Sequence, residues 1–581
     1  MKGAFTINTQ ITPDPSELSV LLGYLSRPQA FPQELAIRGP IPVIQTHASA
    51  VILAGGYAYK LKKARNFGFF DYSTPELRRQ FCEQEVLLNS RLAPHIYQGI
   101  APVLEEADGT LRFGRIFAPG QIPTPNTLLG AARVVDYAVV MQRLPEEATL
   151  AAHVAARTAT PNLLALVAEP LVQFHTSVPT NKHIAEFGSL SVIRGNWDEN
   201  FEQMRPYIGR SLDQSTFDRL STYIYDFMQG YAALFSTRIH EQRIRDCHGD
   251  LRLQHVYIFE QAGDVSPGIS VVDCIEFNER FRYGDVASEV AFLTMELDAA
   301  ERSDLARAFI DAYVSLGKDM ALYELLPFYA CYRACVRGKV LSFQLDQPEV
   351  PQEQRQAVLE EARKLFALAA SNASGPTRPT LLLVGGLMGT GKSTLAKALS
   401  EELGWTLISS DLTRKQLIGL EPSQPQTDAF GEGIYSSVWT ARTYQAMLDQ
   451  AARVLATGRS VILDATFARL AHRHAASQEA TLHGANHVFV ECQVSRDLAL
   501  SRLAERWKVR VARQPALSSS ASDARPELYD TQAASWQPFS AEEEPATEHL
   551  VISSSSPLSL NLARVLDALS IPQHLRRREI A

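Results

Sequence analysis

The sequence predicts a multidomain protein in which an α+β part is followed by an α/β part built on a parallel sheet. Its 581 residues exceed what one hydrophobic core usually supports. A small, polar, proline-containing stretch, SNASGPTRP at residues 371–379, follows a charged helical pattern and precedes a short apolar strand. Beyond it, apolar strands alternate with helical segments, which is typical of parallel sheets with helices on both faces. We therefore predict an N-terminal domain at 1–372, a linker at 373–379 and a C-terminal domain at 380–581.

The overall composition excludes several classes of protein. Hydrophobic residues make up 46% of the chain and charged residues 21%, which are ordinary values for a globular protein. The net charge of −8 argues against an indiscriminate nucleic-acid or membrane-surface binder. The six cysteines include no C-x-x-C pair, so neither a disulfide framework nor a zinc site is predicted. The start shows no apolar signal core and no run is long enough to cross a bilayer, so we expect a soluble cytoplasmic protein.

Local patterns in the N-terminal part predict a hairpin, a helix and a buried strand. The segment AVILAGGYAYKL, at 50–61, consists of two short apolar runs around Gly55 and Gly56, which is a hairpin signal. The second run leads into lysines. A helix and a buried strand are predicted further on, at 81–92 and at 137–144.

Two aspartates of the N-terminal part are candidate functional carboxylates. Asp250 stands at a loop start in CHGDLRLQHVYIF, and Asp273 follows the apolar run of ISVVDCIEFN. The tripeptide H-G-D alone is weak evidence, because His and Asp near Gly often only brace a turn. Asp273, at the end of a predicted strand, is placed as a metal-binding carboxylate would be.

The stretch GGLMGTGKST, at residues 385–394, predicts a nucleotide-binding loop of the Walker A type. It fits the pattern G-x-x-x-x-G-K-[ST] and lies between an apolar strand, 381–384, and an amphipathic helix. Its glycines let backbone N–H groups approach phosphate oxygens, Lys392 neutralises phosphate charge, and the Ser393 hydroxyl can ligate Mg²⁺. The predicted ATP-binding residues are Gly386, Gly389, Thr390, Gly391, Lys392, Ser393 and Thr394.

Polar residues follow two further strands of the predicted parallel sheet. Asp411 comes directly after the strand TLISS, and Arg414 lies one helical turn later. A carboxylate there can take the proton from an acceptor hydroxyl while the guanidinium holds an anion; the alternative is an N-cap Asp with a solvated Arg. A similar D-x-x-R occurs in P-loop small-molecule kinases and in phage-type polynucleotide kinase, which favours the catalytic interpretation. Asp464 ends the strand SVILDA and fits a second carboxylate that reaches Mg²⁺.

Arginines in the segment SRLAERWKVR are candidates for contacts with the transferring phosphoryl group. Arg502 and Arg506 lie one helical turn apart and can face the same way. With Arg510 and Arg513 they resemble the lid of small kinases; the alternative is a solvated basic helix. A serine-rich turn at 518–522 would make such a lid mobile. A weaker candidate for an anion contact is Arg473.

The N-terminal part resembles the protein-kinase-like aminoglycoside phosphotransferase superfamily over roughly residues 40–340. The likeness rests on motifs that occur in the family's order: Lys60, Glu85, His248-Gly249-Asp250 and Asp273. Two longer segments, at 67–94 and 271–293, resemble the bacterial branch that is fused to a P-loop kinase. The resemblance implies a bilobal protein-kinase-like fold, followed by a P-loop domain of the predicted-kinase type with AAA-type ATP binding.

The resemblance also implies roles for these residues. Lys60 would hold the ATP phosphates and Glu85 would steady it, with Lys62 on the same strand face as the second candidate. A solvated strand end is the simpler alternative for both lysines. Asp250 would orient and deprotonate the acceptor hydroxyl, and Asp273 would hold Mg²⁺ that bridges the phosphates.

One position departs from the family pattern H-G-D-x-x-x-x-N, whose Asn binds a metal. This chain has His at that position, and we place His255 beside Asp273 as a metal ligand. Imidazole suits softer metals than the oxygen ligands that Mg²⁺ prefers. This departure motivates an alternative in which the N-terminal domain senses nucleotide without transfer. We expect His248 to order the loop and Asp285 to cap a helix beside the site.

The predicted function is that of a phosphotransferase that uses ATP and Mg²⁺. The C-terminal domain would transfer the γ-phosphoryl group to a hydroxyl of a small molecule, and the N-terminal domain would act on another hydroxyl compound. A polynucleotide 5′-kinase is the alternative for the C-terminal domain, suggested by Asp411 and Arg414. The acidic net charge and the lack of an evident aromatic stacking platform oppose it.

Overall fold

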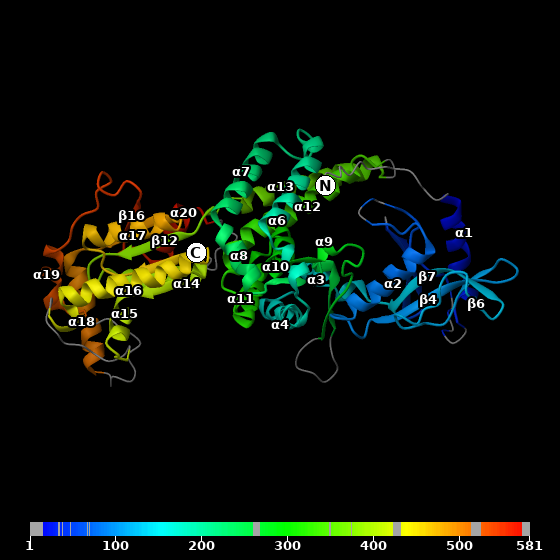
Figure 1. Ribbon diagram of the computed structural model, residues 1–581, viewed down its shortest axis with the longest axis horizontal. Coiled ribbons are helices and arrows are strands. Elements are labelled where there is room, and N and C mark those ends of the chain that lie inside the picture. Colours follow the sequence, from blue (N-terminus) through cyan, green and yellow to red (C-terminus); the bar gives the residue numbers. More distant parts are fainter. Residues whose placement is uncertain are drawn as a thin grey trace. The chain divides into compact units, whose positions relative to one another are not determined.

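The computed structural model describes most of the chain between residues 15 and 571. Outside the description lie 1–14, 33–34, 36, 38, 47, 67, 69, 260–267, 348–349, 374, 422–431, 513–523 and 572–581. The chain divides into two compact units (Figure 1). Unit 1 comprises Met1–Phe187 and Ile244–Gly317, and unit 2 comprises Gly188–Arg243 and Lys318–Ala581.

Unit 1 contains a seven-stranded antiparallel sheet, in the order β1-β2-β3-β7-β4-β5, with β6 paired to β7. Its strands are β1 (Val43–Gln45), β2 (Ser49–Ala54), β3 (Tyr57–Lys62), β4 (Tyr97–Glu105), β5 (Leu111–Phe113), β6 (Leu128–Leu129) and β7 (Ala132–Gln142). Two helices accompany it, α1 (Pro15–Leu25) and α2 (Pro75–Asn89). The predicted hairpin is confirmed as β2 and β3, which turn at Gly55 with φ +62°.

Successive side chains of the sheet point to opposite faces, and each face forms a hydrophobic core. Ala138 and Val140 of β7 belong to the core that includes Leu25 of α1. Tyr137 and Val139 belong to the other core, which includes side chains of α2. The helix α2 is thereby held against the sheet with one face toward β4 and β7.

The remainder of unit 1 is mainly helical, which confirms the predicted α+β class. Its helices are α3 (Leu150–Ala155), α4 (Pro161–Ser177), α5 (Lys182–Glu186), α9 (Glu279–Arg282), α10 (Val286–Ala299) and α11 (Ser303–Gly317). Two short ribbons complete it: β8 (Ile244–Asp246) with β11 (Tyr283–Asp285), and β9 (Val256–Phe259) with β10 (Gly268–Val271). Asp285 accepts a 2.9 Å hydrogen bond from the Ala287 N–H, so it caps α10 as predicted.

Unit 2 begins with a bundle of helices and continues into a parallel sheet. The bundle comprises α6 (Leu190–Met204), α7 (Gln214–Gly230), α8 (Ala232–His240), α12 (Leu322–Gln344) and α13 (Gln352–Asn372). The sheet has the order β13-β14-β12-β15-β16, and every pairing is parallel, which confirms the predicted α/β class. Its strands are β12 (Thr380–Gly385), β13 (Thr406–Ser409), β14 (Val461–Asp464), β15 (Asn486–Gln493) and β16 (Glu548–Ser553).

Helices cover both faces of this parallel sheet. The helices of this part of unit 2 are α14 (Lys392–Leu403), α15 (Ser410–Leu417), α16 (Ser437–Ala456), α17 (Leu470–Leu482), α18 (Arg496–Ala512), α19 (Tyr529–Ala534) and α20 (Leu558–Ala568). One core joins the sheet to α14 and α20, and the other joins it to α16 and α17. All six residues of the central strand β12 are buried, as expected for a strand with helices on both sides.

The helical bundle of unit 2 packs against the amino ends of the sheet strands. Glu324 of α12 accepts a 2.9 Å hydrogen bond from the Ser460 N–H, and Ser460 Oγ accepts one of 3.0 Å from the Thr380 N–H. A Cβ atom added at Gly458 would lie 2.3 Å from the Leu234 backbone nitrogen. Unit 2 therefore contains residues from both sides of the predicted linker, and the division of the sequence into domains there stays a prediction.

Candidate active sites

In unit 1, a strand and a neighbouring helix bring two lysines to one buried glutamate. Lys60 Nζ lies 2.8 Å from Glu85 Oε1, and Lys62 Nζ lies 2.6 Å from Glu85 Oε2. Lys60 and Lys62 are two residues apart on β3 and so share a strand face, and Glu85 lies on α2. Burial raises the pKa of Glu85, but the charges of Lys60 and Lys62 lower it below its ordinary value. The glutamate is therefore held as a carboxylate between two ammonium groups.

The two lysines differ in their other contacts. Lys60 Nζ lies 2.8 Å from Asp273 Oδ1, and its side chain is 18% exposed. Lys62 is only 1% exposed and pairs with Glu276, which also accepts a 2.7 Å hydrogen bond from the Tyr72 hydroxyl. Burial lowers the pKa of Lys60, but Asp273 and Glu85 raise it well above its ordinary value. Lys60 thus reaches toward Asp273, whereas Lys62 is enclosed in a buried network.

The loop that carries His248, Gly249 and Asp250 is fixed through its backbone. Glu289 of α10 accepts hydrogen bonds from the His248 N–H at 3.0 Å and from the Gly249 N–H at 2.6 Å. Gly249 has φ +88°, and an added Cβ would lie 2.7 Å from the Phe281 carbonyl oxygen, so only glycine fits. Burial lowers the pKa of His248 to about 4. His248 is therefore neutral at pH 7, which suits a residue that orders the loop.

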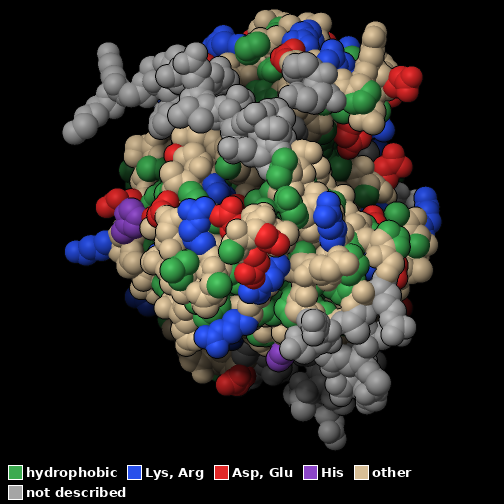
Figure 2. Space-filling view, turned by 90° about the vertical axis from the view of Figure 1, so that its right-hand side faces the viewer, with side chains coloured by type: hydrophobic (Ala, Val, Ile, Leu, Met, Phe, Trp, Pro, Cys, Tyr) green, Lys and Arg blue, Asp and Glu red, His purple; other side chains and the backbone are tan. Residues whose placement is uncertain are grey.

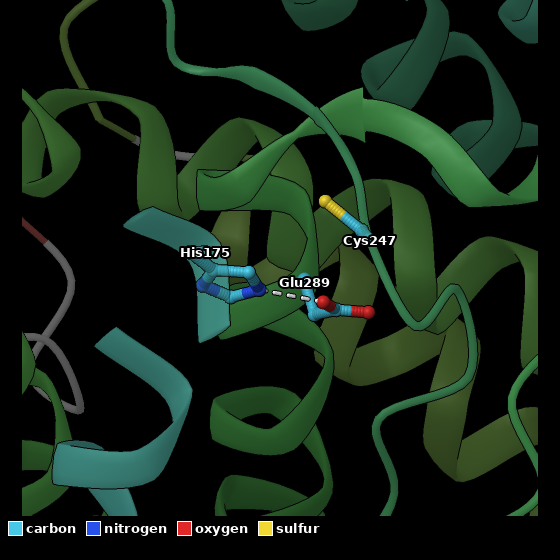
Figure 3. Close-up of side chains that lie close together, drawn as sticks. All are labelled: His175, Cys247 and Glu289. Atoms are coloured by element: carbon cyan, nitrogen blue, oxygen red, sulfur yellow. Dashed lines mark hydrogen bonds and ion pairs between the residues drawn. The ribbon is translucent and has the colours of Figure 1, made fainter. Parts of the chain in front are cut away.

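Behind this loop, His175, Cys247 and Glu289 lie close together (Figure 3). His175 Nε2 lies 2.7 Å from Glu289 Oε2, and His175 Nδ1 lies 2.7 Å from the Tyr313 hydroxyl. Burial raises the pKa of Glu289, but the hydrogen bond and charge of His175 lower it to about 2. Because the ring nitrogens and the carboxylate oxygens are already engaged, this cluster clamps the loop and does not present a metal site. No signal in the sequence had singled out His175 or Glu289.

Three residues with metal-ligating side chains converge near Lys60. Ligand atoms of Asp250, His255 and Asp273 all lie within 4.8 Å of one another. Asp273 has φ +66°, an unfavourable conformation for a residue with a Cβ, and such conformations concentrate at functional sites. Lys60 lowers the pKa of Asp273 well below its ordinary value, against the opposing effect of desolvation. Two carboxylates and an imidazole so placed fit a divalent cation.

The phosphate loop of unit 2 joins β12 to α14, and its shape depends on glycine. Gly386, Gly389 and Gly391 have φ angles of +136°, +79° and +80°. A Cβ added at Gly386 would lie 2.4 Å from the Cys492 carbonyl oxygen. The Thr390 hydroxyl is buried and donates to the Leu387 carbonyl at 2.7 Å, so it shapes the loop from inside. The loop therefore presents backbone, not side chains, to its centre.

The helix that follows the loop begins with residues that suit phosphate and metal binding. Lys392 is the first residue of α14, and Ser393 and Thr394 are exposed in its first turn. Asp464, at the end of β14, is hydrogen-bonded to Ser393. Burial raises the pKa of Asp464 to about 6, while Lys392 and Ser393 act to lower it. Among the described residues its buried Oδ1 has no hydrogen-bond partner, so the residues fit a cation at this position.

Beside the phosphate loop, α15 carries Asp411 in its first turn and Arg414 in its last turn. Arg414 Nη1 lies 3.6 Å from Asp411 Oδ1. The N-cap of α15 is Ser409, so Asp411 is not the cap residue. The Arg414 guanidinium lies over the Tyr435 ring, 4.8 Å from its centroid, and its buried Nε has no hydrogen-bond partner among the described residues. Tyr435 was not a candidate from the sequence, because its distance along the chain gave no hint of this contact.

The candidate lid arginines fall into three groups. Arg502 donates hydrogen bonds to the Ser554 hydroxyl, at 2.9 Å, and to the Ser554 carbonyl oxygen, at 2.7 Å. A Cβ added at Gly391 would lie 3.9 Å from Arg502 Nη1, so this guanidinium is close to the phosphate loop. Arg506 is exposed on the same helix. The Arg510 side chain, Arg513 and the serine-rich turn lie outside the described residues.

Arg473 has a structural place instead of the anion contact considered from the sequence. It is fully buried. Its guanidinium pairs with the buried Glu544 at 2.7 Å and donates to the Phe467 carbonyl at 2.9 Å. Because the fold itself engages these donors, Arg473 does not offer them to a ligand.

Comparison with known proteins agrees with the two kinds of site. Residues 99–326 match the family model described as the phosphotransferase enzyme family, and residues 381–529 match the model described as an AAA domain. Among solved structures, a choline/ethanolamine kinase family protein from Mesorhizobium loti aligns with 62% of this chain and 98% of its own, at 12% identity and a TM-score of 0.35. A gluconokinase from Sinorhizobium meliloti aligns with 34% of this chain and 98% of its own, at 18% identity and a TM-score of 0.21.

The fold, the sites and the family matches define the class of protein: an ATP-dependent kinase that combines an aminoglycoside-phosphotransferase-like domain with a P-loop kinase domain. Curated relatives match this chain over most of their length. The proteins Rv2004c of Mycobacterium tuberculosis and Mb2027c of Mycobacterium bovis are 31% identical to this chain over 468 residues, which is 80% of this chain and 86% of theirs. The chain belongs to the family of these mycobacterial proteins. Among the described residues, no helix is both long and apolar enough to span a membrane.

Proposed function

We propose that the C-terminal domain transfers the γ-phosphoryl group of ATP to a hydroxyl group of a small molecule. The observation that carries this proposal is the convergence of Lys392, Asp411 and Asp464. Asp464 ends β14, and Lys392 and Asp411 lie in the helices that follow the parallel strands β12 and β13. All three therefore lie at the carboxyl edge, where ligands bind in such sheets.

Each residue of this site has a role that its surroundings support. The loop backbone and Lys392 hold the phosphates, and Ser393 and Asp464 hold Mg²⁺, which when bound neutralises phosphate charge. Asp411, whose side chain is 29% exposed, accepts the proton of the acceptor hydroxyl. Arg502, close to the loop, and Arg506, one turn further on, are the arginines we propose for the phosphoryl charge.

The surroundings of Arg414 favour an acceptor that carries an anionic group. Its guanidinium is buried against Tyr435 and keeps an unengaged Nε donor in the described structure. A carboxylate or phosphate on the acceptor supplies the missing partner, since guanidinium groups bind both in a fork geometry. The rings of Tyr444 and His472 are stacked, with centroids 3.8 Å apart. The charges of Asp411 and Arg414 affect the pKa of the Tyr444 hydroxyl, so this aromatic pair lies near them and can form one wall of the acceptor site.

A polynucleotide 5′-kinase is the second candidate, favoured by the same pair of Asp411 and Arg414. The net charge of −8 opposes it. On the face drawn in Figure 2, which is the side of Figure 1 where α1 and β6 are labelled, Lys and Arg side chains are interspersed with Asp and Glu. Incubation of the full chain with labelled ATP and 5′-hydroxyl oligonucleotides distinguishes the two, because label on the oligonucleotide supports this candidate and its absence supports a small acceptor.

For the N-terminal domain we propose a second transfer to a hydroxyl compound. Lys60 holds the phosphates, Glu85 fixes Lys60, Asp273 holds a metal ion and Asp250 accepts the proton. Asp250 has a side chain that is 30% exposed and lies near Asp273, as a base beside the metal must. The alternative, a nucleotide sensor without transfer, predicts ATP binding that no hydroxyl compound converts into turnover.

The test is ATP consumption by the full chain with a panel of sugars, nucleosides, aminoglycosides and oligonucleotides. We expect Lys392→Ala to abolish stimulation by acceptors of the C-terminal domain, and Asp250→Ala to abolish stimulation by acceptors of the N-terminal domain. Stimulation by one compound that survives in both single variants contradicts both assignments. An N-terminal domain that binds ATP without any stimulation supports the sensor alternative.

A further inference from the structure

The metal-ligating cluster of unit 1 differs in chemistry from that of unit 2. At the P-loop the candidate ligands are the oxygen atoms of Ser393 and Asp464. In unit 1 an imidazole joins two carboxylates, because His255 lies with Asp250 and Asp273. This difference between two sites of one chain bears on which metal ion each site selects.

The hydrogen bonds of His255 fix which ring nitrogen is available. His255 Nδ1 lies 2.8 Å from the backbone carbonyl oxygen of Asp250, which can only accept a hydrogen bond. Nδ1 therefore donates this hydrogen bond, and Nε2 is the ring nitrogen that can bind a metal ion. A hydrogen bond from the other nitrogen is the usual way in which proteins orient a metal-binding histidine.

Nε2 lies near a carboxylate oxygen of Asp273. His255 Nε2 lies 3.5 Å from Asp273 Oδ2, so one cation can contact both atoms. Lys60 contacts Oδ1 of the same carboxylate, so Oδ2 is left for a different partner. The amide of Gln254, which lies 3.1 Å from Nε2, is on an exposed side chain and can turn away.

The ring is also held in place by its surroundings. His255 is 7% exposed, at the end of the short 3₁₀ helix Leu253–His255, immediately before β9. Asp273 follows β10, the strand that pairs with β9, so the two ligands are presented by neighbouring strands of one ribbon. A site with a fixed nitrogen ligand discriminates between metals by donor type and not only by charge.

We propose that the N-terminal site binds a first-row divalent transition-metal ion in preference to Mg²⁺, through His255 Nε2 and Asp273, with Asp250 as a further oxygen ligand. Mg²⁺ favours oxygen ligands and gives up water reluctantly, whereas imidazole nitrogen suits transition metals. The P-loop site, with its oxygen ligands, keeps the preference for Mg²⁺. The proposal rests on the metal-binding role proposed above for Asp273, but it concerns metal binding and does not require turnover.

The experiment uses Mn²⁺ as the probe and pulsed electron paramagnetic resonance of the full chain without nucleotide. A directly bound imidazole nitrogen gives a ¹⁴N coupling to Mn²⁺, whereas oxygen ligands give none. We expect this coupling in the wild type and in Asp464→Asn, which removes a ligand of the P-loop site. It should disappear in His255→Asn and weaken in Asp273→Asn.

Competition with Mg²⁺ supplies the second readout. Two variants are compared, Asp464→Asn and His255→Asn/Asp464→Asn; the second has the oxygen ligand of the family pattern. We expect the Mg²⁺ concentration that displaces Mn²⁺ to be at least about 10-fold higher in Asp464→Asn than in the double variant. Circular dichroism of each variant checks that it is folded, and His255→Gln serves as the second substitution if His255→Asn is not. The proposal is overturned if the ¹⁴N coupling persists in His255→Asn and in His255→Gln, or if it is absent from the wild type with Mn²⁺ bound. It is also overturned if Mg²⁺ displaces Mn²⁺ at the same concentration with and without His255. None of these readouts depends on phosphoryl transfer, so an inactive N-terminal domain can still satisfy them.

Discussion

The two candidate nucleotide sites are built in opposite ways. The phosphate loop of unit 2 is one continuous stretch whose shape depends on three glycine φ angles and on backbone groups. In unit 1, Lys60 contacts Asp273, a residue 213 positions away in the sequence, and both are held by a buried network of charged side chains. A backbone-built site therefore fails when a Cβ atom is added, whereas a side-chain-built site fails when a buried charge loses its partner.

The largest effect is expected from Lys62→Met. The change leaves Glu85 and Glu276, whose side chains are 1% and 7% exposed, with one ammonium fewer between them. An uncompensated buried charge costs about 3 to 5 kcal/mol, and we expect this loss in the stability of unit 1. Hydrogen–deuterium exchange of β3 and α2 in urea measures it.

Two further variants show whether charge is the cause of that loss. Lys60→Met should cost less stability, because Lys60 and its partner Asp273 are 18% and 49% exposed. In Lys62→Met/Glu276→Gln much of the stability should return, since the second change removes the unpaired carboxylate. Equal losses in the two single lysine variants would show that packing, and not charge, dominates this network.

These contrasting constructions also explain what the sequence revealed. The P-loop, its strand and its helix were predicted correctly because the determining residues are contiguous and the glycine spacing is tied to one backbone shape. The two apolar runs around Gly55 and Gly56 likewise predicted the hairpin β2–β3, and Asp285 caps α10 as expected. The order of Lys60, Glu85 and Asp273 indicated a family, and their predicted roles stay predictions.

What the sequence left open are contacts between distant side chains. Lys62 and Lys60 share a strand face, so no pattern shows which of them is enclosed by Glu276 and Tyr72. The clamp of His175 on Glu289 joins two helices that are far apart in the chain, and either residue alone has the pattern of a helix core. Such pairings are decided by tertiary packing, which local composition does not encode.

A second feature of the side-chain-built site is that its stability depends on pH through His248, in the loop of unit 1. The folded protein holds His248 with a pKa of about 4, against 6.5 in the unfolded chain. The unfolded state therefore binds the extra proton first, and stability present above pH 6.5 is lost as the pH falls toward 4, by up to about 3 kcal/mol. Urea unfolding of the wild type and of His248→Gln across this range measures it. If the two proteins show the same slope, His248 does not contribute.

The backbone-built site is tested by Gly386→Ala. With φ at +136° and an added Cβ 2.4 Å from the Cys492 carbonyl oxygen, the loop must shift. Strain of about 1 to 3 kcal/mol lowers ATP affinity at this site by roughly 5- to 150-fold. Calorimetric ATP binding in a Lys60→Met background isolates the site. The matched control is Gly419→Ala, which has φ +71° but open space around the new Cβ, and should bind ATP normally.

The smallest effect is expected from Thr390→Val, although Thr390 lies inside the phosphate loop. Its hydroxyl donates to the Leu387 carbonyl at 2.7 Å, and the side chain is 2% exposed, so it supports the loop and does not reach its centre. Loss of one such hydrogen bond costs about 1 kcal/mol, which corresponds to roughly a 5-fold weaker ATP affinity. Thr390→Ser keeps the donor and should restore most of the affinity. A different result would be a loss of ATP affinity in Thr390→Val as large as that in Gly386→Ala, with the same loss in Thr390→Ser. The threonine methyl, and not the backbone, would then set the shape of the loop, and the contrast between the two sites would fail at this residue.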